Sequence, residues 1–120
     1  MAEHNDIGEL GEGLARDYLK KKGYQILETN WQYRKDEIDI IAEDDEFLVI
    51  VEVKTRTTNY WGEPEVFVNR QKQRFMVRAA NAYIEQTDND KEVRFDIIAV
   101  LISRGKHKIH HIDDAFYPLL

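Results

Sequence analysis

Cysteine is absent from the 120-residue sequence, and so is any uninterrupted apolar run of the roughly 20 residues needed to span a bilayer. The first absence excludes disulfide bonds and thiolate metal ligands, and it suits a reducing compartment. The second argues against a membrane-spanning helix, and residues 1–10 lack the basic-then-apolar order of a secretion signal. We therefore expect a soluble cytoplasmic protein that does not enter a membrane.

A glycine-rich phosphate loop and a His-Glu-x-x-His metal motif are missing as well, which removes two familiar kinds of catalytic site. What is present is a hydrophobic share of 42%, enough for one compact domain with a buried core. Because a second domain would be improbably small in a chain of this length, we predict a single domain over residues 1–120.

The distribution of charge is more informative than the net charge of −6, which argues against indiscriminate binding to polyanions. Residues 36–52 contain eight acids and no base, whereas residues 66–84 contain four bases and no acid. The first segment suits a cation site and the second suits a polyanion-binding surface. Two solvated faces are the alternative interpretation.

Hydrophobic spacing predicts an α/β protein with the element order α-β-β-β-α-β-β and a mixed sheet of about five strands flanked by helices. Gly62 and Pro64 mark a loop before the second helix. The expected helices are residues 8–22 and a segment that begins near residue 69, and the expected strands are residues 24–31, 37–42, 47–54, 92–102 and 106–113.

The second expected strand carries acids within an apolar run. Side chains alternate between the two faces of a strand, so Glu37 and Asp39 share one face while Ile38 and Ile40 share the other. An acidic turn then leads into the third strand, which suggests that the two strands form a hairpin.

The third expected strand, residues 47–54, places Glu52 and Lys54 on one face. A two-residue hairpin turn would pair Glu37 with Glu52, whereas a four-residue loop would pair Asp39 with Glu52. Either register gathers these charged groups on one face at the open end of the hairpin.

Such a cluster is costly, because two carboxylates about 4 Å apart repel by roughly 4 kcal/mol at an effective dielectric constant of about 20. A divalent cation offsets this repulsion, and Mg²⁺ or Mn²⁺ prefers oxygen ligands. We therefore interpret Glu52 as a metal ligand held on a rigid strand, with Lys54 orienting or helping to deprotonate a metal-bound water. The alternative is a chance Glu-x-Lys ion pair on an exposed strand.

The second expected helix presents two kinds of cation. Arg70, Arg74 and Arg78 recur every four residues and form a stripe suited to backbone phosphates. Lys72 lies outside that stripe, on the face that packs on the sheet, so its amine must extend past the edge of the core. It could reach the charged end of the hairpin, or it could extend into water.

Taken together, these motifs resemble the PD-(D/E)XK nuclease superfamily, which has an Asp in one strand followed by Glu-x-Lys in the next. More closely, nearly the whole chain resembles the small bacterial YraN-type family, whose fold is similar to archaeal Holliday junction resolvases. The resemblance implies a restriction-endonuclease-like core. The matching segments are residues 8–31, 36–56, 72–84, 94–100 and 110–116.

The resemblance implies site residues and a cofactor. Asp39 and Glu52 correspond to ligands of Mg²⁺ or Mn²⁺, Lys54 to the catalytic lysine, and Glu12 to a further acidic member of the site. Glu37 is another candidate ligand because it shares a strand face with Asp39.

Lys72 and Arg56 match basic positions of the family that contact phosphate. The sequence departs from the family pattern at Asp36, which replaces a glycine, and at Ile38, which replaces the proline of the superfamily name. An extra carboxylate at position 36 could perturb a tight turn or the field around the metal.

The predicted function is therefore a metal-dependent endonuclease acting on structured or branched DNA. The alternative is a module that keeps the nuclease fold and binds nucleic acid or a protein partner without catalysis. Because junction resolvases need two active sites, a homodimer would suit such a substrate.

Two further groups of residues have competing interpretations. A transition metal could bind the histidines of the last strand, although an exposed edge is the commoner role of such a strand; these are His107, His110 and His111. Aromatic residues around the expected site could stack on unpaired bases or simply pack; these are Trp31, Tyr33, Tyr60 and Trp61.

Overall fold

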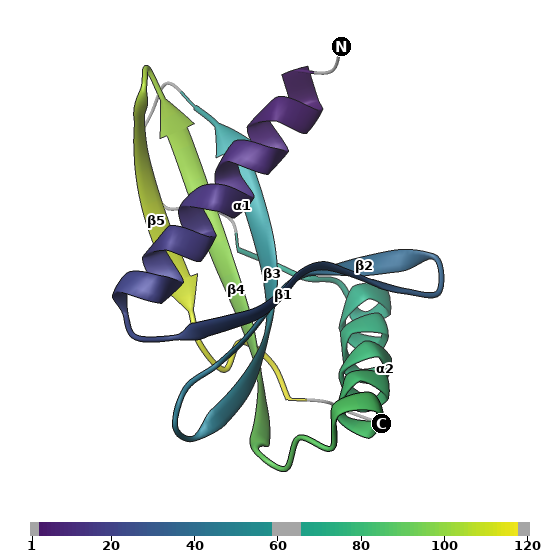
Figure 1. Cartoon of the computed structure of the whole chain (residues 1–120). Helices are drawn as coiled ribbons and strands as arrows, with labels where there is room; N and C mark the ends of the chain where they lie inside the picture. The colour runs from purple at the N-terminus through teal and green to yellow at the C-terminus, as the bar shows by residue number, and fades with distance from the viewer. Residues whose placement is uncertain (1–2, 59–65, 118–120) are drawn as a thin grey trace.

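The computed structural model describes residues 3–58 and 66–117, and in this part of the chain it contains two helices and five strands (Figure 1). The elements are α1 (Glu3–Lys21), β1 (Gln25–Tyr33), β2 (Asp36–Glu43), β3 (Phe47–Thr57), α2 (Arg70–Thr87), β4 (Glu92–Ser103) and β5 (Lys106–Ile112). The predicted α-β-β-β-α-β-β order is confirmed. The predicted loop residues Gly62 and Pro64, and the aromatic residues Tyr60 and Trp61, lie outside the described residues.

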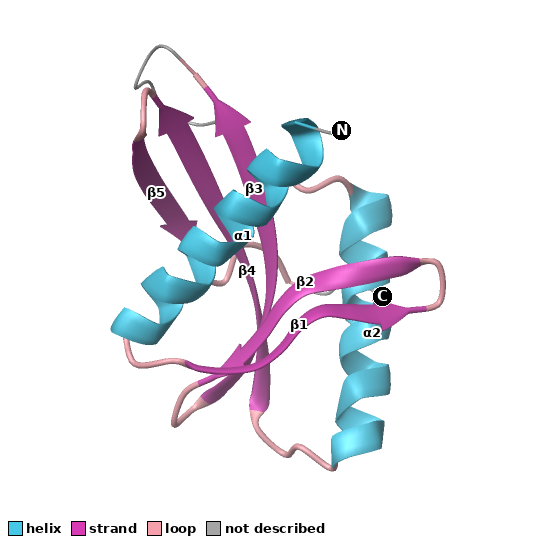
Figure 2. Cartoon of the chain, turned by 45° about the horizontal axis from the view of Figure 1, so that its top comes forward, coloured by secondary structure: helices cyan, strands magenta, loops and turns pink. Residues whose placement is uncertain are grey.

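The strands form one mixed sheet in the order β1-β2-β3-β4-β5, in which β3 and β4 are parallel and the other neighbours are antiparallel. The two helices cover opposite faces of this sheet (Figure 2). The central strands are buried on both sides, which explains why their sequences are almost continuously apolar. The predicted α/β class and mixed sheet are therefore confirmed.

On the first face, α1 buries Ala15 and Leu19 against apolar side chains of the central strands. The helix lies close to β3 at Gly11, where an added Cβ would overlap the side chain of Thr55. Glycine is needed here because no other residue allows the helix backbone to lie so near the strand. This approach brings the next residue, Glu12, to Asn30 of β1 and near Asp39.

On the second face, α2 begins with an Asn69 cap whose Oδ1 accepts a hydrogen bond of 2.8 Å from the backbone N–H of Lys72. Its buried face includes Met76, Ala79 and Tyr83, which pack against the sheet. The first turn of this helix, including Lys72, is thereby fixed beside the end of the β2–β3 hairpin.

The β2–β3 hairpin pairs Ile41 with Ile50 and Glu43 with Leu48. Continuing this register by one pair beyond its last member, Ile40 with Val51, places Asp39 opposite Glu52. The structure therefore adopts the register expected for a four-residue loop. The turn is closed by Asp44, whose N–H donates to the Phe47 carbonyl at 3.1 Å.

The β1–β2 hairpin twists away from the central sheet (Figures 1 and 2). Ile38 belongs to the α2-side core and Ile40 to the α1-side core, so the expectation that they share a face is wrong. In the register of β1 and β2, Asn30 lies opposite Asp39, and its φ of 48° is left-handed. The pair of strands therefore departs from regular β geometry at the point where the side chains of β2 change face.

The chain after β5 docks on the sheet. The Ala115 N–H donates to the Phe95 carbonyl at 2.7 Å, and the Phe116 ring stacks on the Phe95 ring at a centroid distance of 5.0 Å. Among the described residues, no helix has the length and apolar character needed to cross a membrane.

Candidate metal and nucleic-acid site

Asp39 lies where β2 separates from β3, and its carboxyl group takes over a backbone hydrogen bond of the sheet. The N–H of Val53 donates to Asp39 Oδ2 at 2.7 Å, although continued pairing would have placed Ile38 opposite Val53. Burial and the nearby charge of Glu52 together raise the pKa of Asp39 to about 8, despite this hydrogen bond. Asp39 is thus a carboxyl group whose surroundings oppose its negative charge.

Glu52 extends from β3 on the side that faces α2, and only 17% of its side chain is exposed. Burial raises the pKa of Glu52, while the positive charges of Lys72 and Lys54 and a hydrogen bond with Asp39 act in the opposite direction. The two carboxyl groups therefore interact with each other, and two ammonium groups lie near Glu52. Sequence alternation placed Lys54 correctly in this neighbourhood.

Lys72 reaches the charged end of the hairpin instead of extending into water. Its Nζ lies 3.0 Å from Asp36 Oδ2 and 3.7 Å from Glu52 Oε1, and it also lies 5.0 Å from the centre of the Phe75 ring. Burial lowers the pKa of Lys72, but the charge of Glu52 and the hydrogen bond to Asp36 raise it overall. The carboxylate at position 36 therefore serves as a partner of Lys72.

Glu12 approaches the same site from α1. Its Oε1 accepts a hydrogen bond of 2.9 Å from Asn30 Nδ2, and its negative charge is one of the causes that raise the pKa of Asp39. Sequence reasoning missed Asn30. A usable signal was present, because asparagine is disfavoured in strands and tolerates left-handed backbone, so its position inside an expected strand was unusual.

The donor set fits a hard cation that retains water ligands. Within residues 3–58 and 66–117, no three carboxylate or imidazole side chains converge as a group that could by itself hold a metal. Mg²⁺ is commonly bound by only one or two carboxylates, with waters completing an octahedron. Asp39 and Glu52 provide such a pair, and the charge of Glu12 also acts on Asp39.

Comparison with known sequences places the chain in a family. Residues 11–100 match the model described as "Uncharacterised protein family UPF0102". The chain belongs to the UPF0102 family. A UPF0102 protein of Flavobacterium psychrophilum is 55% identical over 117 residues, and one of Christiangramia forsetii is 49% identical over 117 residues, with 98% of each chain covered in both cases. A third, from Flavobacterium johnsoniae, is 46% identical over 121 residues with the same coverage.

The region matched by the UPF0102 model contains all of the charged residues that gather at the end of the β2–β3 hairpin, but it ends before β5. The candidate site is therefore built from the part of the chain that defines the family. These residues are Glu12, Asp36, Asp39, Glu52, Lys54 and Lys72.

The arginine stripe of this UPF0102 protein does not face the carboxyl pair. At 3.6 residues per turn, Arg70, Arg74 and Arg78 lie on the side of α2 opposite Met76 and Ala79, which are buried against the sheet. All three arginines are exposed and form no hydrogen bond or ion pair within the described part of the chain. They form an outer surface of α2 that is separate from the position of Lys72.

Two other predicted site residues are peripheral. Arg56 is exposed near the end of β3, and its Nη1 donates to the Thr55 carbonyl at 2.9 Å. Glu37 has no side-chain contact with Asp39 or Glu52 in the described structure, and its charge is not among the causes of their pKa shifts. Glu37 is therefore a weaker candidate ligand than its position in the sequence indicated.

The histidines of β5 do not form a metal site within the described residues. His111 is not part of an exposed edge, because its side chain is 7% exposed. Its Nε2 lies 2.8 Å from Asp96 Oδ2, and its Nδ1 lies 3.0 Å from the Tyr18 hydroxyl. Both ring nitrogens are therefore occupied by protein partners.

The aromatic residues Trp31 and Tyr33 lie in β1 and stack on each other at a centroid distance of 6.2 Å. Trp31 also packs edge-on against Tyr83, and Tyr33 packs against Phe75, so both rings attach the hairpin to α2. Packing is their observed role.

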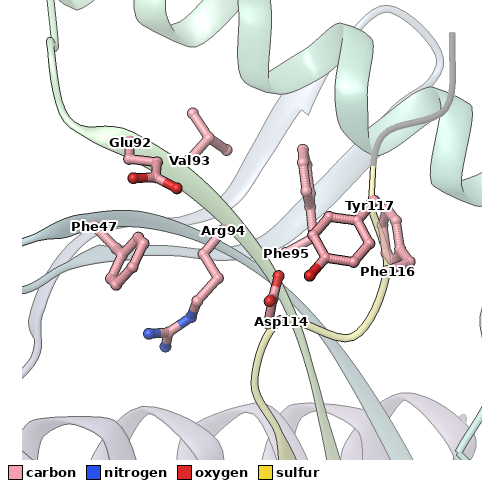
Figure 3. Close-up of a pocket in the computed structure, with 8 residues that line it drawn as sticks. All are labelled: Phe47, Glu92, Val93, Arg94, Phe95, Asp114, Phe116 and Tyr117. Atoms are coloured by element: carbon pink, nitrogen blue, oxygen red, sulfur yellow. The ribbon is translucent and has the colours of Figure 1, made fainter.

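A cavity of about 390 Å³ lies at the opposite end of the sheet, near the first residues of β3 and β4. Figure 3 shows Phe95, Phe116 and Tyr117 on one side of it and Phe47 with Arg94 on the other. Because neither Asp39 nor Glu52 lines it, this cavity is distinct from the candidate site.

Proposed function

We propose that this UPF0102 protein is a metal-dependent endonuclease of the PD-(D/E)XK type that hydrolyses phosphodiester bonds in DNA, with structured or branched duplexes as its favoured substrates. The observation that carries this proposal is the pairing of two half-buried carboxyl groups, Asp39 and Glu52, which lie opposite each other on neighbouring strands beside Lys54. Perturbed carboxyl groups grouped with cations are typical of functional sites. The α-β-β-β-α-β-β order supports the same superfamily.

Asp39 and Glu52 would hold Mg²⁺ or Mn²⁺ at the end of the β2–β3 hairpin. When bound, the cation would act as a Lewis acid toward a phosphate oxygen and would lower the pKa of a coordinated water. The chain's own contribution is rigidity, because Asp39 is anchored by the Val53 N–H and Glu52 lies on a central strand. Lys54 would orient the attacking water and stabilise negative charge on the phosphate.

The cations around this pair would bind the DNA backbone. Lys72 is already held 3.7 Å from Glu52, and Arg56 follows Lys54 on the same face of β3. The exposed surface formed by Arg70, Arg74 and Arg78 would bind more distant phosphates of a long or branched substrate. A homodimer would supply two such sites to a four-way junction, in a cytoplasmic setting.

The second candidate is a non-catalytic module that binds nucleic acid or a protein partner. One observation favours it, namely that Lys72 supplies an intramolecular cation to Glu52 and Asp36. Such a module would bind DNA equally well in the presence of a chelator. It would also keep its affinity when Asp39 or Glu52 is neutralised.

Cleavage and binding measured on the same variants separate the two candidates. Asp39→Asn, Glu52→Gln and Lys54→Met should each lower cleavage of a four-way junction in Mg²⁺ or Mn²⁺ by at least about 100-fold while binding in EDTA is retained. Glu46→Gln, in the exposed turn of the same hairpin, is the matched control and should cleave like the wild type. A wild-type protein that binds duplex, flap and junction DNA but cleaves none of them would favour the binding module.

A further inference from the structure

The tip of the β1–β2 hairpin is a short exposed cationic turn. Arg34 and Lys35 lie between Tyr33 and Asp36, which form the last pair of the two strands. Arg34 has a φ of 58°, a left-handed conformation that glycine adopts at much lower cost. The Gln32 side chain steadies the turn by donating from Nε2 to the Arg34 carbonyl at 2.8 Å. The hairpin therefore presents an arginine where backbone geometry alone would favour glycine.

The Arg34 guanidinium is held against an aromatic ring. Its Nε donates to the Tyr33 hydroxyl at 3.1 Å, and its Cζ lies 5.4 Å from the centre of the Tyr33 ring. Tyr33 is itself packed between Trp31 and Phe75 of α2. Ordering the guanidinium in advance lowers the entropy lost when it binds an anion, and its two terminal nitrogens match the spacing of phosphate oxygens.

The tip is linked to the carboxyl pair through a single ammonium group. Asp36 follows Lys35, and Lys72 bridges Asp36 to Glu52 at 3.0 Å and 3.7 Å. Lys72 also forms an ion pair with Asp36, the acid next to the tip. In contrast to the arginine stripe of α2, this turn is linked to the candidate metal site through Asp36 and Lys72.

The β4–β5 hairpin offers a natural comparison within the same chain. Its turn, closed by Ser103 and Lys106, contains Arg104 with a φ of 52° and Gly105. Arg104 is exposed, and within the described residues it contacts no aromatic ring and no acid. The two turns thus share a length of two residues and a left-handed arginine, and each has one lysine, which is Lys35 within the first turn and Lys106 in the closing pair of the second. They differ in their support and in their connection to Glu52.

From these contacts we infer that the Arg34–Lys35 turn binds backbone phosphates of the DNA strand next to the phosphate held at Asp39 and Glu52. This inference rests on the proposed nuclease function for the identity of the partner. It assigns a phosphate-binding role to two residues that neither the motif nor the helix stripe includes.

The test compares matched double variants of the two turns. Arg34→Gly with Lys35→Gln removes the cations and relieves the backbone strain, and Arg104→Gly with Lys106→Gln does the same at the other turn. Binding of a fluorescein-labelled four-way junction and a labelled duplex is measured by anisotropy in EDTA and in CaCl₂ at several NaCl concentrations. Thermal unfolding checks that all variants are folded.

The Arg34–Lys35 variant should raise Kd about tenfold and lower the slope of log Kd against log salt by about 1 to 2, because each lost phosphate contact lowers the slope by roughly 0.9. The Arg104–Lys106 variant should change Kd by less than about twofold. Unchanged binding by the first variant, equal losses in both, or a wild type that binds neither DNA would overturn the inference.

Cleavage in Mn²⁺ distinguishes this inference from the proposed function. If the wild type binds but does not cleave, and only the Arg34–Lys35 variant binds weakly, the nuclease proposal fails and the phosphate contact stands. If the wild type cleaves and the Arg34–Lys35 variant cleaves with unchanged KM, the phosphate contact fails and the nuclease proposal stands.

Discussion

Two carboxyl groups of one sheet, the buried Asp96 and the half-buried Asp39, lie in opposite electrostatic surroundings. Asp96, which is 0% exposed in β4, accepts two hydrogen bonds from Arg94 at 2.9 and 2.8 Å and one from the Asp114 N–H at 3.1 Å, and it contacts His111 Nε2 at 2.8 Å. Although burial raises the pKa of Asp96, these partners lower it overall. Asp39 accepts one backbone hydrogen bond and faces Glu52, and its pKa is raised to about 8.

The comparison distinguishes Asp96, a carboxylate that stabilises the fold, from Asp39, a carboxyl group whose surroundings are typical of a functional site. At Asp96 every oxygen is matched by donors, and the Arg94 guanidinium continues to the Tyr24 hydroxyl at 2.7 Å. Asp39, in contrast, faces the carboxyl group of Glu52, at a position where a cation would be stabilising. Natural proteins tolerate uncompensated buried charge chiefly where a ligand or reaction uses it.

The largest expected effect is a loss of stability on neutralising Asp96. Asp96→Asn would leave the Arg94 guanidinium, whose side chain is 10% exposed, without its anionic partner. Breaking one side of a buried ion pair typically costs about 3–5 kcal/mol, and we expect a loss of this size in the free energy of unfolding by urea.

The control for Asp96→Asn is Asp113→Asn in the exposed segment after β5, which should change stability by less than about 0.5 kcal/mol. Combining Asp96→Asn with Arg94→Met should restore part of the loss, since the unpaired charge is then removed. A loss below about 1 kcal/mol for Asp96→Asn would mean that the two carboxyl groups do not differ as described.

The next largest expected effect is a gain in stability when Asp39 is neutralised. The folded pKa of Asp39, about 8, exceeds the unfolded value near 4, so the folded state binds more protons and wild-type stability falls as pH rises from about 4 to about 8. Asn cannot lose a proton. In EDTA, Asp39→Asn should therefore be more stable than the wild type by about 2 kcal/mol at pH 8, less than the shift alone implies because Glu52 shares the titration.

The response of Tm to Mn²⁺ should also differ between the wild type and Asp39→Asn. Adding Mn²⁺ should raise the Tm of the wild type at pH 8, because binding to the folded state alone is stabilising, and it should not raise the Tm of Asp39→Asn. Asp45→Asn in the exposed hairpin turn should behave like the wild type. If Asp39→Asn is less stable than the wild type at pH 8 in EDTA, the surroundings of Asp39 stabilise its negative charge, and the contrast with Asp96 is wrong.

Much of the fold was predictable because its signals are local. Helical spacing of apolar residues predicted both helices, and the apolar runs of β3 and β4 predicted central strands buried on two faces. The neighbourhood of Asp39, Glu52 and Lys54 followed from alternation along a hairpin. The register remained open until the structure showed a turn closed by Asp44 and Phe47.

The remaining features depend on tertiary geometry. Alternation failed at Ile38, next to the left-handed Asn30 of the neighbouring strand, and nothing in the apolar pattern encodes that φ. The partners of Asp96 come from elements far apart in the chain, so no spacing rule groups them. The outward direction of the arginine stripe relative to the carboxyl pair likewise depends on how α2 is docked.

A third prediction concerns the helix that brings Glu12 to the uncompensated site. Gly11→Ala places a methyl group in the Thr55 side chain, so α1 must shift, and we expect a stability loss of about 1–2 kcal/mol. Gly8→Ala is the matched control, because nothing lies near its added Cβ and alanine favours helix, so it should gain about 0.5–1 kcal/mol. Urea unfolding measures both, and a gain in both would show that α1 does not need its close approach.

A fourth prediction uses low pH to distinguish Asp96 from Asp39. The pKa of Asp96 is lowered on folding, so the unfolded state takes up its proton first and stability falls as pH drops below about 4 through the folded pKa. One such group contributes a slope of at most about 1.4 kcal/mol per pH unit. Asp96→Asn should have a shallower acid limb than the wild type in urea unfolding at pH 2 to 5, and an unchanged slope would show that Asp96 is not its source.

The smallest expected effect concerns Asn30, whose side-chain amide donates a hydrogen bond to Glu12. Asn30→Gly keeps the left-handed backbone without strain and removes only the amide that donates to Glu12, so stability should change by less than about 0.5 kcal/mol. Glu12 would then be less well ordered beside Asp39, and the Mn²⁺-induced rise in Tm should decrease. Asn30→Asp keeps the size and backbone preference but repels Glu12, and it should decrease the rise further. A full Mn²⁺ response in both variants would limit Asn30 to shaping the hairpin, because a purely conformational role predicts that glycine substitutes without loss.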